Sequence, residues 1–377
     1  EISGGSLGVL LIGSQYTTTV NNNRIGGPTP EERNVIAGAG SYCCEGSPSG
    51  AQVAVRMGVG TIIEGNYIGT TPDGSAGAGQ IGPVGVEVND SDGTVIQDNV
   101  IADIFAIGVN HFSGQEFGVG VSIFGSSDGT VVQGNLIGTD ATGMNAIPNL
   151  NGLAVSPFLA GQNPTNTLIG GEFSEDGNVV AHSMRTGVRL TGNIEGVTLR
   201  NNRIYNNDDL GIDLDAIGVT VNDAGDNDGG ANNRQNFPVI AQATASESTL
   251  AVQGSLNSRP SESYRLEFFG SAQCDPSGHG EGELVLGSVT VESDGSGDAS
   301  FDETFSFDSD IAIVTATATR LSTGDTSEFS QCVEVVIDDS RPADLDNSDT
   351  VDVMDLLILL GAWGECDGEC PADLDAS

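Results

Sequence analysis

Apolar residues recur along the first 236 positions in short runs that each begin with an asparagine. The Asn is followed by two or three mostly apolar residues and then by a small or polar one. The runs begin at Asn23, Asn34, Asn66, Asn99, Asn135, Asn178 and Asn202. A unit that recurs every ~20–50 residues is typical of solenoid proteins, so this region predicts a stack of similar coils.

Two other kinds of short run lie between the asparagine runs. One alternates apolar with other residues after a glycine, as at Gly85–Val88, Gly120–Ile123 and Gly187–Leu190. The second kind follows it, at Thr94–Ile96, Thr130–Val132 and Val197–Leu199. Three short strands per repeat predict one coil of a parallel β-helix, with Val, Ile and Leu pointing inward. The asparagines are expected to stack in ladders at turns that need unusual backbone angles.

Asp92-Gly93 and Asp128-Gly129 offer an alternative interpretation, because Asp-Gly pairs often form two-residue hairpin turns. Hairpins would arrange the strands as mirrored pairs, whereas the three kinds of run recur in one fixed order. We therefore predict parallel pairing of the strands over residues 1–236.

An acidic, Asn-rich segment from Gly211 to Pro238 ends the repeats, and a strict two-residue alternation follows it from Val239 to Ile337. The expected strands are Thr249–Leu256, Tyr264–Gly270, Leu284–Val291, Ile311–Thr319 and Cys332–Ile337. About 100 residues of this kind are typical of an immunoglobulin-like β-sandwich. Cys274 and Cys332 flank these strands, and we predict a disulfide bond between them.

The composition indicates several hydrophobic cores and an exported protein. A chain of 377 residues usually divides into two or three domains. Six cysteines without zinc-type spacing favour disulfides and an oxidising compartment, although the partners of Cys43, Cys44, Cys366 and Cys370 stay open. No apolar run reaches the ~18 residues of a membrane-spanning helix, and the start at Glu1 resembles a processed or truncated end. We expect an extracellular or cell-surface protein.

The charge is strongly negative, at −41, from 53 acidic residues against 12 basic ones, all of them arginine. Such a surface repels phosphate backbones and anionic lipid, so nucleic acid is excluded as an expected partner. The acidity fits either a surface solvated for salty water or specific cation storage.

The most specific chemical motif is a twelve-residue acidic loop from Asp344 to Asp355. Oxygen ligands at alternating positions of a tight loop are what Ca²⁺ requires. The predicted metal ligands are Asp344, Asp346, Ser348, the Thr350 carbonyl, Asp352 through water, and Asp355. Asp349 stands at position six, where glycine is expected, so we predict reduced affinity. An apolar helix is expected over Val353–Trp363, and the alternative is a solvated acidic turn before that helix.

A second acidic cluster follows the last repeat, with eight oxygen-bearing side chains within 21 residues. Its members are Asp208, Asp209, Asp213, Asp215, Asn222, Asp223, Asp226 and Asp228. This cluster predicts either a second Ca²⁺ site, at the junction of the repeats with the sandwich, or a flexible acidic linker.

Several motifs resemble known families. The blocks Gly134–Gly143, Asn34–Gly38 and Asn22–Gly27 resemble right-handed parallel β-helix repeat proteins of the pectin-lyase-like fold in environmental bacteria. The calcium loop and helix, with "PADLD" at 342–346 and again 29 residues later at 371–375, are similar to a type I dockerin of the form common in planctomycetes. Dockerins bind cohesin modules, so this resemblance implies a cohesin-like or surface protein as partner.

The resulting fold class is all-β, in three parts. We expect a right-handed parallel β-helix over residues 1–236, an immunoglobulin-like β-sandwich over 237–338 and a dockerin-like segment with a truncated second repeat over 339–377. The expected function is a structural or adhesive surface protein with a Ca²⁺-dependent anchor and no catalytic residues.

The alternative function is an extracellular polysaccharide lyase or glycoside hydrolase, with a polysaccharide as partner. Enzymes of the pectin-lyase-like fold use a calcium-bound carboxylate cluster with a basic residue, or paired Asp residues. The nearest set here is Arg185, Arg189, Arg200 and Arg203, with Asp213 and Asp215. Such residues more often form surface ion pairs, and convergence of an Arg with two carboxylates in a groove would favour the enzyme.

Overall fold

The computed structural model is mostly β, with 46% of residues in strands and 6% in helices. It describes residues 7–13, 20–43, 47–79, 82–106, 117–159, 161–246, 248–308, 310–338, 345–346 and 352–361. No helix among these residues is long and apolar enough to span a membrane.

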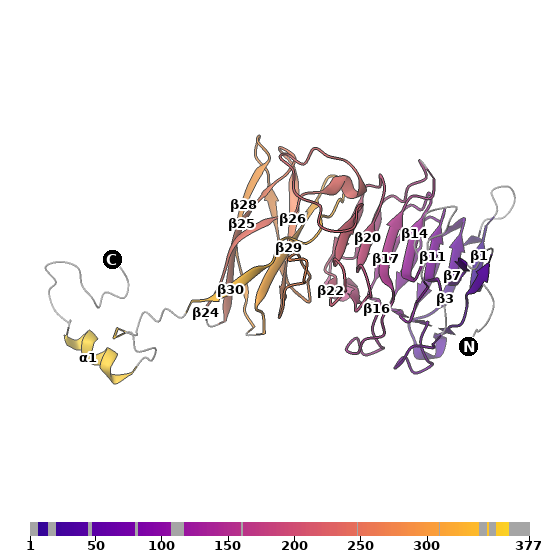
Figure 1. Ribbon diagram of the computed structural model, residues 1–377, viewed down its shortest axis with the longest axis horizontal. Helices are drawn as coiled ribbons and strands as arrows, with labels where there is room; N and C mark the ends of the chain where they lie inside the picture. Colours follow the sequence, from indigo (N-terminus) through magenta and orange to yellow (C-terminus); the bar gives the residue numbers. More distant parts are fainter. Residues whose placement is uncertain are drawn as a thin grey trace.

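Three parallel sheets form the first part of the chain, and their strands stack in chain order (Figure 1). The seven-stranded sheet consists of β1 (Leu7–Ile12), β7 (Ala51–Arg56), β11 (Val84–Asn89), β14 (Val119–Phe124), β17 (Asn151–Ser156), β20 (Val188–Leu190) and β23 (Ile212–Leu214). One six-stranded sheet consists of β4 (Val35–Ile36), β10 (Tyr67–Ile68), β13 (Val100–Ile101), β16 (Leu136–Ile137), β19 (Val179–Ala181) and β22 (Arg203–Tyr205). The other consists of β3 (Arg24–Gly26), β9 (Ile62–Glu64), β12 (Val95–Gln97), β15 (Val131–Gln133), β18 (Thr167–Gly170) and β21 (Val197–Arg200).

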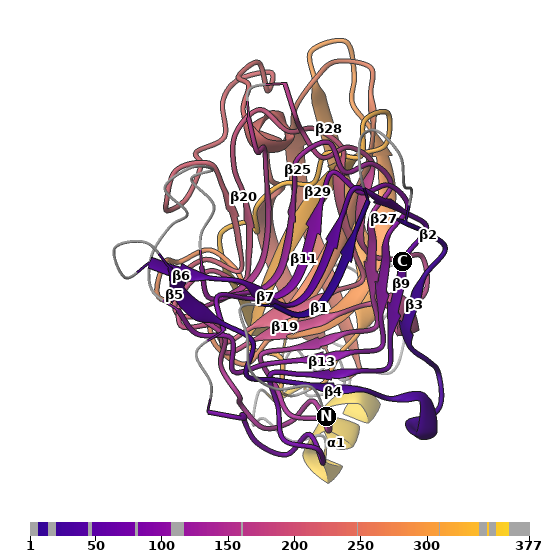
Figure 2. The ribbon, with the colours of Figure 1, turned by 90° about the vertical axis from the view of Figure 1, so that its right-hand side faces the viewer.

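Figure 2 shows these sheets as three sides around a common interior. Every strand pair within them is parallel, as in the register Val86↔Val121↔Leu153 of the seven-stranded sheet. The predicted parallel pairing is confirmed, and the arrangement is compatible with a parallel β-helix. Two short pairs lie outside the three sheets: parallel β2 (Val20–Asn21) with β8 (Gly58–Val59), and antiparallel β5 (Ser41–Cys43) with β6 (Ser47–Ser49). Two short 3-10 helices, η1 (Pro30–Glu32) and η3 (Ser174–Asp176), lie in the loops of this region.

Buried asparagines stack along one bend, as predicted. Asn66, Asn99 and Asn135 are fully buried, and each side-chain amide donates to the next asparagine at 2.9–3.0 Å. The ladder runs through Asn34, Asn66, Asn99, Asn135, Asn178 and Asn202. The unusual backbone angles belong to the preceding residues instead, because Gly65 and Asp98 have φ of 67° and 55°.

Asn23 was wrongly grouped with this ladder. Its strand, β3, pairs with β9 in a different sheet from β4 and β10. The motif is too short to show which of two neighbouring sheets a strand joins, and the spacing of only 11 residues from Asn23 to Asn34 is less than one coil.

The second part is one seven-stranded sheet that is antiparallel except where β24 pairs with β30. Its strands are β24 (Val239–Ser246), β25 (Thr249–Asn257), β26 (Ser263–Ser271), β27 (Leu284–Glu292), β28 (Asp298–Ser306), β29 (Ile313–Arg320) and β30 (Val333–Ile337). β24 and β28 were missed by the sequence prediction. We call this part the antiparallel unit; it has its own core, around Tyr264, Leu266 and Phe268.

The antiparallel unit closes the end of the stacked coils. Phe269 and Phe329, with ring centroids 5.2 Å apart, belong to the same core cluster as the aliphatic interior of the coils. An uncovered last coil would expose unpaired backbone N–H groups. Instead, side chains of the unit accept hydrogen bonds from them: Asp325 from Gly196, Thr326 from Leu199, Glu267 from Asn201, Glu281 from Asn207 and Glu328 from Leu214. The two parts are therefore joined by an apolar cluster and by a polar seam, while the antiparallel unit keeps its own core.

Candidate functional site

Three of the predicted calcium ligands, Asp346, Asp352 and Asp355, lie in the described chain. Asp344, Ser348 and Thr350 lie outside the described residues. Asp355 is only 3% exposed, and its carboxylate accepts backbone hydrogen bonds from Leu345 at 2.6 Å, Asp346 at 3.2 Å and Asp352 at 2.6 Å. These bonds lower the pKa of Asp355, that from Asp352 most strongly. The backbone at Leu345 and Asp346 and that at Asp352 therefore meet around the Asp355 carboxylate.

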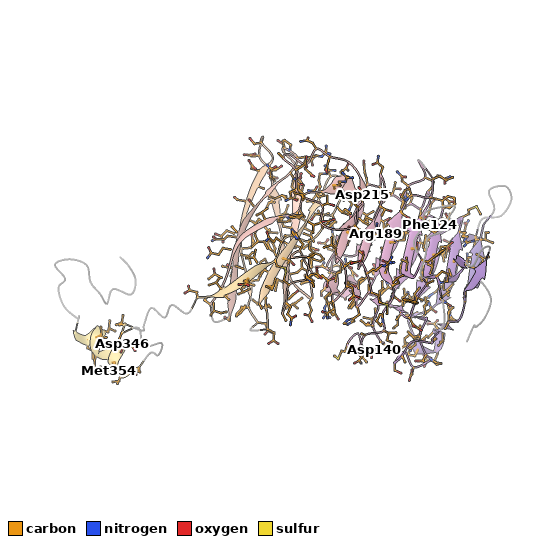
Figure 3. The ribbon with its side chains drawn as sticks, viewed as in Figure 1. Phe124, Asp140, Arg189, Asp215, Asp346 and Met354 are labelled. Atoms are coloured by element: carbon orange, nitrogen blue, oxygen red, sulfur yellow. A yellow bond between two sulfur atoms is a disulfide. The ribbon has the colours of Figure 1, made fainter. Side chains whose placement is uncertain are left out.

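The predicted helix begins directly after this loop, as α1 (Val353–Gly361). Asp352 caps it, because its carboxylate accepts the Met354 N–H at 2.6 Å. Five large apolar side chains of α1 are exposed, at 63% for Val353 and 51–55% for Met354, Leu356, Leu357 and Leu360, and two more are partly buried. A helix with so much exposed apolar surface is typical of an element that docks on a partner. Figure 3 labels Asp346 and Met354 in this segment.

The second acidic cluster lies at the seam, where only three of its eight members converge. Oxygens of Asp223, Asp226 and Asp228 lie within 4.8 Å of one another, and no other such group of three occurs among the described residues. Asp226 is fully buried and accepts hydrogen bonds from Ser258 at 2.6 Å and from Asn236 at 3.1 Å. One buried oxygen each of Asp223 and Asp228 has no hydrogen-bond donor.

Two asparagines fix the backbone around these carboxylates. The Asn222 side chain exchanges two hydrogen bonds with the backbone of Phe237, and the Asn236 side chain does the same with Asp223. The segment is thus an ordered loop and not a flexible linker. Burial raises the pKa of Asp226 and of Asp228, and the charge of Asp223 raises that of Asp228 further. A cation bound between the three carboxylates would offset the free-energy cost of burying their negative charges.

Asp215 belongs to a separate network. Its carboxylate accepts hydrogen bonds from the Gly192 N–H, the Ala231 N–H and the Arg234 side chain at 2.9–3.1 Å. Ala231 opens η4 (Ala231–Arg234), a short 3-10 segment. Arg234 also lies 3.7 Å from Asp228, so it links this network to the three convergent carboxylates.

Arg189 and Asp213 face each other on β20 and β23, where they are partners in the parallel register. Their charged groups are 3.5 Å apart, and Arg189 also donates to the Asp215 carbonyl at 3.3 Å. Asp213 is 1% exposed, and burial raises its pKa to about 7 despite the opposing charge of Arg189. A carboxyl group that is partly protonated near neutral pH can act as an acid or a base.

The other predicted arginines do not join this pair. Arg200 bonds to Glu172 at 3.1 Å. Arg203 donates to the Glu283 carbonyl at 2.8 Å and lies over the Tyr205 ring. Within the set that the sequence grouped, the described ion pairs therefore join only Arg189 to Asp213.

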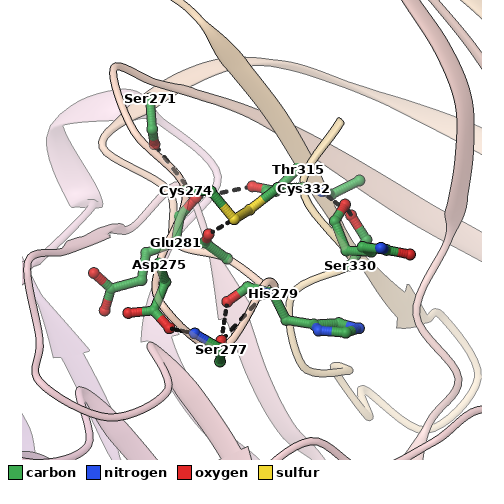
Figure 4. The surroundings of a disulfide bond; sticks show 12 residues. Ser271, Cys274, Asp275, Ser277, His279, Glu281, Thr315, Ser330 and Cys332 are labelled. Atoms are coloured by element: carbon green, nitrogen blue, oxygen red, sulfur yellow. Dashed lines mark hydrogen bonds between the residues drawn. A yellow bond between two sulfur atoms is a disulfide. The ribbon is translucent and has the colours of Figure 1, made fainter. Parts of the chain in front are cut away.

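The predicted disulfide between Cys274 and Cys332 is confirmed, with Cα atoms 5.9 Å apart (Figure 4). It ties the loop after β26 to the start of β30. The side chain of Cys43 and the residues Cys44, Cys366 and Cys370 lie outside the described structure.

Sequence reasoning missed the seam carboxylates that the antiparallel unit supplies, above all Glu281. It is 6% exposed, and burial raises its pKa to about 8. Its acceptor role depends on Asn207, 74 residues away, and no local pattern signals that contact.

No protein-family model matches the sequence, and no curated protein matches it.

Proposed function

We propose that this chain is a secreted or cell-surface structural or adhesive protein with a calcium-dependent anchor. In this proposal the stacked coils are a right-handed parallel β-helix of the pectin-lyase-like fold and serve as a stiff stalk. The antiparallel unit is an immunoglobulin-like β-sandwich, and the acidic loop with α1 is a dockerin-like segment that docks on a cohesin-like or other surface protein.

The observation that carries this proposal is the exposed apolar surface of α1 next to the loop gathered around Asp355. Leu356, Leu357 and Leu360 are each more than half exposed, and burying such side chains on a partner is worth roughly 1.5–3 kcal/mol apiece. Carboxylates in the preceding loop repel one another, and Ca²⁺ would offset this repulsion and stiffen the base of the helix. Calcium binding and docking are therefore coupled in the proposal.

We assign the Ca²⁺ to two places. The first is the predicted loop, with Asp344, Asp346, Ser348, Thr350, Asp352 and Asp355 as ligands. The second is the junction group of Asp223, Asp226 and Asp228, where oxygens within 4.8 Å of one another suit a cation that binds oxygen at about 2.3–2.6 Å. The sandwich residue Ser258 holds Asp226, so this ion would also brace the seam.

The chain provides its own reporter for the loop, because its single tryptophan, Trp363, follows α1 by two residues. Titrating the full chain with Ca²⁺ should give a saturable change in tryptophan fluorescence, with a dissociation constant of roughly 10⁻⁴–10⁻³ M. Asp346→Asn should abolish the change, and Asp310→Asn, an exposed acid in the antiparallel unit, should leave it intact. An unchanged response in Asp346→Asn would refute the loop assignment.

The second candidate function, a polysaccharide lyase or glycoside hydrolase, is favoured by one observation: Arg189 beside Asp213, whose pKa burial raises to about 7. In that case purified protein should depolymerise pectic polysaccharide, with a bell-shaped pH profile that Asp213→Asn removes. Activity retained in Asp213→Asn would remove this pair from any catalytic role.

A further inference from the structure

A cavity of about 570 Å³ lies at the seam, between the last coil and the loop that carries Cys274. This volume falls within the range of about 300–1,000 Å³ that is usual for small-molecule sites, which often form where two domains meet. The lining residues are Tyr205 to Asp208 from the coil, and Ser271 to Pro276, Glu281 and Glu283 from the antiparallel unit.

The walls of this cavity are fixed by strong local contacts. Ile204 and Gly282 exchange two backbone hydrogen bonds, of 2.8 and 2.7 Å, which join the coil to the antiparallel unit. The Cys274–Cys332 disulfide holds the loop on the other side (Figure 4). Thr315 donates to the Glu281 carbonyl at 2.9 Å, so the segment that carries Glu281 is held as well. The cavity is therefore preformed, and a ligand would bind without ordering its walls.

The lining selects for positive charge. Four acidic residues are among the lining residues: Asp208 comes from the coil, and Asp275, Glu281 and Glu283 come from the antiparallel unit. No arginine is among the lining residues, although Arg203 lies over the Tyr205 ring, 5.3 Å from its centroid. Glu281, 6% exposed, is held in place by the Asn207 side chain at 2.7 Å. The acidic residues of this lining disfavour anionic ligands.

The spacing of these carboxylates argues against a single metal ion. Among the described residues only Asp223, Asp226 and Asp228 bring three ligand atoms within 4.8 Å of one another. The cavity carboxylates are spread over three chain segments instead, so an extended cation with separate charges matches them better than a point charge.

We propose that this junction cavity binds a small organic polyamine, whose ammonium groups pair with Asp208 from the coil and with Asp275 and Glu283 from the antiparallel unit. The inference is independent of the calcium sites. Because the ligand contacts both parts, it also ties the last coil to the unit that closes it.

Calorimetric titration of the full chain with spermidine in 0.15 M salt tests the proposal; at that salt concentration diffuse attraction to the acidic surface is screened beyond about 8 Å. We expect one saturable site per chain. Asp208→Asn with Asp275→Asn should weaken binding at least tenfold. Asp308→Asn with Asp310→Asn, which removes the same charge from an exposed loop, should leave it unchanged.

A single substitution, Glu283→Gln, separates a loss of binding from misfolding of the double variant. It should weaken polyamine binding several-fold without shifting the unfolding temperature. Equal weakening in the cavity and control variants would show attraction to the acidic surface only, and would overturn the proposal. Absence of a saturable site in the wild type would overturn it as well.

Discussion

Single buried polar side chains determine how the coils stack. The Asn135 side chain illustrates this, because it accepts the backbone N–H of Asn99 at 3.0 Å and donates to the Ile96 and Gln133 carbonyls at 2.8 and 2.9 Å. An asparagine in this ladder thus satisfies backbone groups of its own coil and of the coil before it, which an aliphatic residue of the same size cannot do.

Asn135→Ala should therefore destabilise the protein by roughly 3 kcal/mol, since each buried polar group left without a partner costs about 1–3 kcal/mol. Urea unfolding followed by circular dichroism measures the loss. The control is Asn193→Ala at an exposed position, which should stay within about 0.5 kcal/mol of the wild type. A similar small effect of both substitutions would contradict a stabilising ladder.

Glu281 makes stability depend on pH. Burial raises its folded-state pKa from 4.5 to about 8, so the folded protein holds this proton more tightly than the unfolded chain. The contribution of Glu281 is complete below pH 4.5 and is lost as the pH rises toward 8. The unfolding temperature should fall between pH 5 and pH 8, and Glu281→Gln should make that fall shallower. Identical pH profiles would show that Glu281 titrates normally.

At the scale of elements, the closed end of the coils depends on carboxylates of the antiparallel unit. Glu328, only 2% exposed, accepts the N–H of Leu214 at 2.9 Å and that of Thr220 at 2.8 Å. Its charge also raises the pKa of Asp213, so the seam and the Arg189 pair are coupled electrostatically.

Glu328→Ala should increase local opening of β23, the last strand of the seven-stranded parallel sheet. We expect hydrogen exchange at the Leu214 and Thr220 amides to accelerate about thirtyfold or more, as a loss of roughly 2 kcal/mol requires. Glu334→Ala, at an exposed position on β30, is the matched control. Unchanged exchange at both amides would mean that other contacts hold the seam closed.

Local sequence patterns predicted the elements whose residue pattern recurs along the chain. The Asn runs and the alternating valines gave the parallel sheets, and two cysteines beside alternating strands gave the disulfide. β24 and β28 were missed: β24, at Val239–Ser246, is mostly small or polar, and β28, at Asp298–Ser306, alternates phenylalanine with charged residues in an acidic background. Long-range contacts such as Glu281 with Asn207 leave no local trace.

The candidate sites were predictable to different degrees. The sequence placed the start of α1 correctly, because Asp352 caps the helix there, whereas the calcium ligands of the loop stay a prediction. It grouped eight oxygen-bearing side chains at the seam, of which the carboxylates of Asp223, Asp226 and Asp228 alone meet among the described residues. The others were separated by backbone folding: Asp213 lies on β23, and Asp215 bonds to η4.

At the scale of the whole molecule, a charge of −41 opposes compactness unless cations bind. In our account Ca²⁺ acts at two places: between the coils and the antiparallel unit, and at the anchor that presents α1. Both ions would reduce carboxylate repulsion where parts of the chain must hold a fixed geometry.

Counting bound Ca²⁺ by equilibrium dialysis of the full chain tests this account most directly. We predict two saturable sites in the wild type and in Asp310→Asn. Asp346→Asn should lose the anchor site and Asp223→Asn the seam site, so each should keep one. The variant that combines Asp346→Asn with Asp223→Asn should have none. Wild-type protein without saturable sites at millimolar Ca²⁺, or two sites persisting in the combined variant, would contradict it.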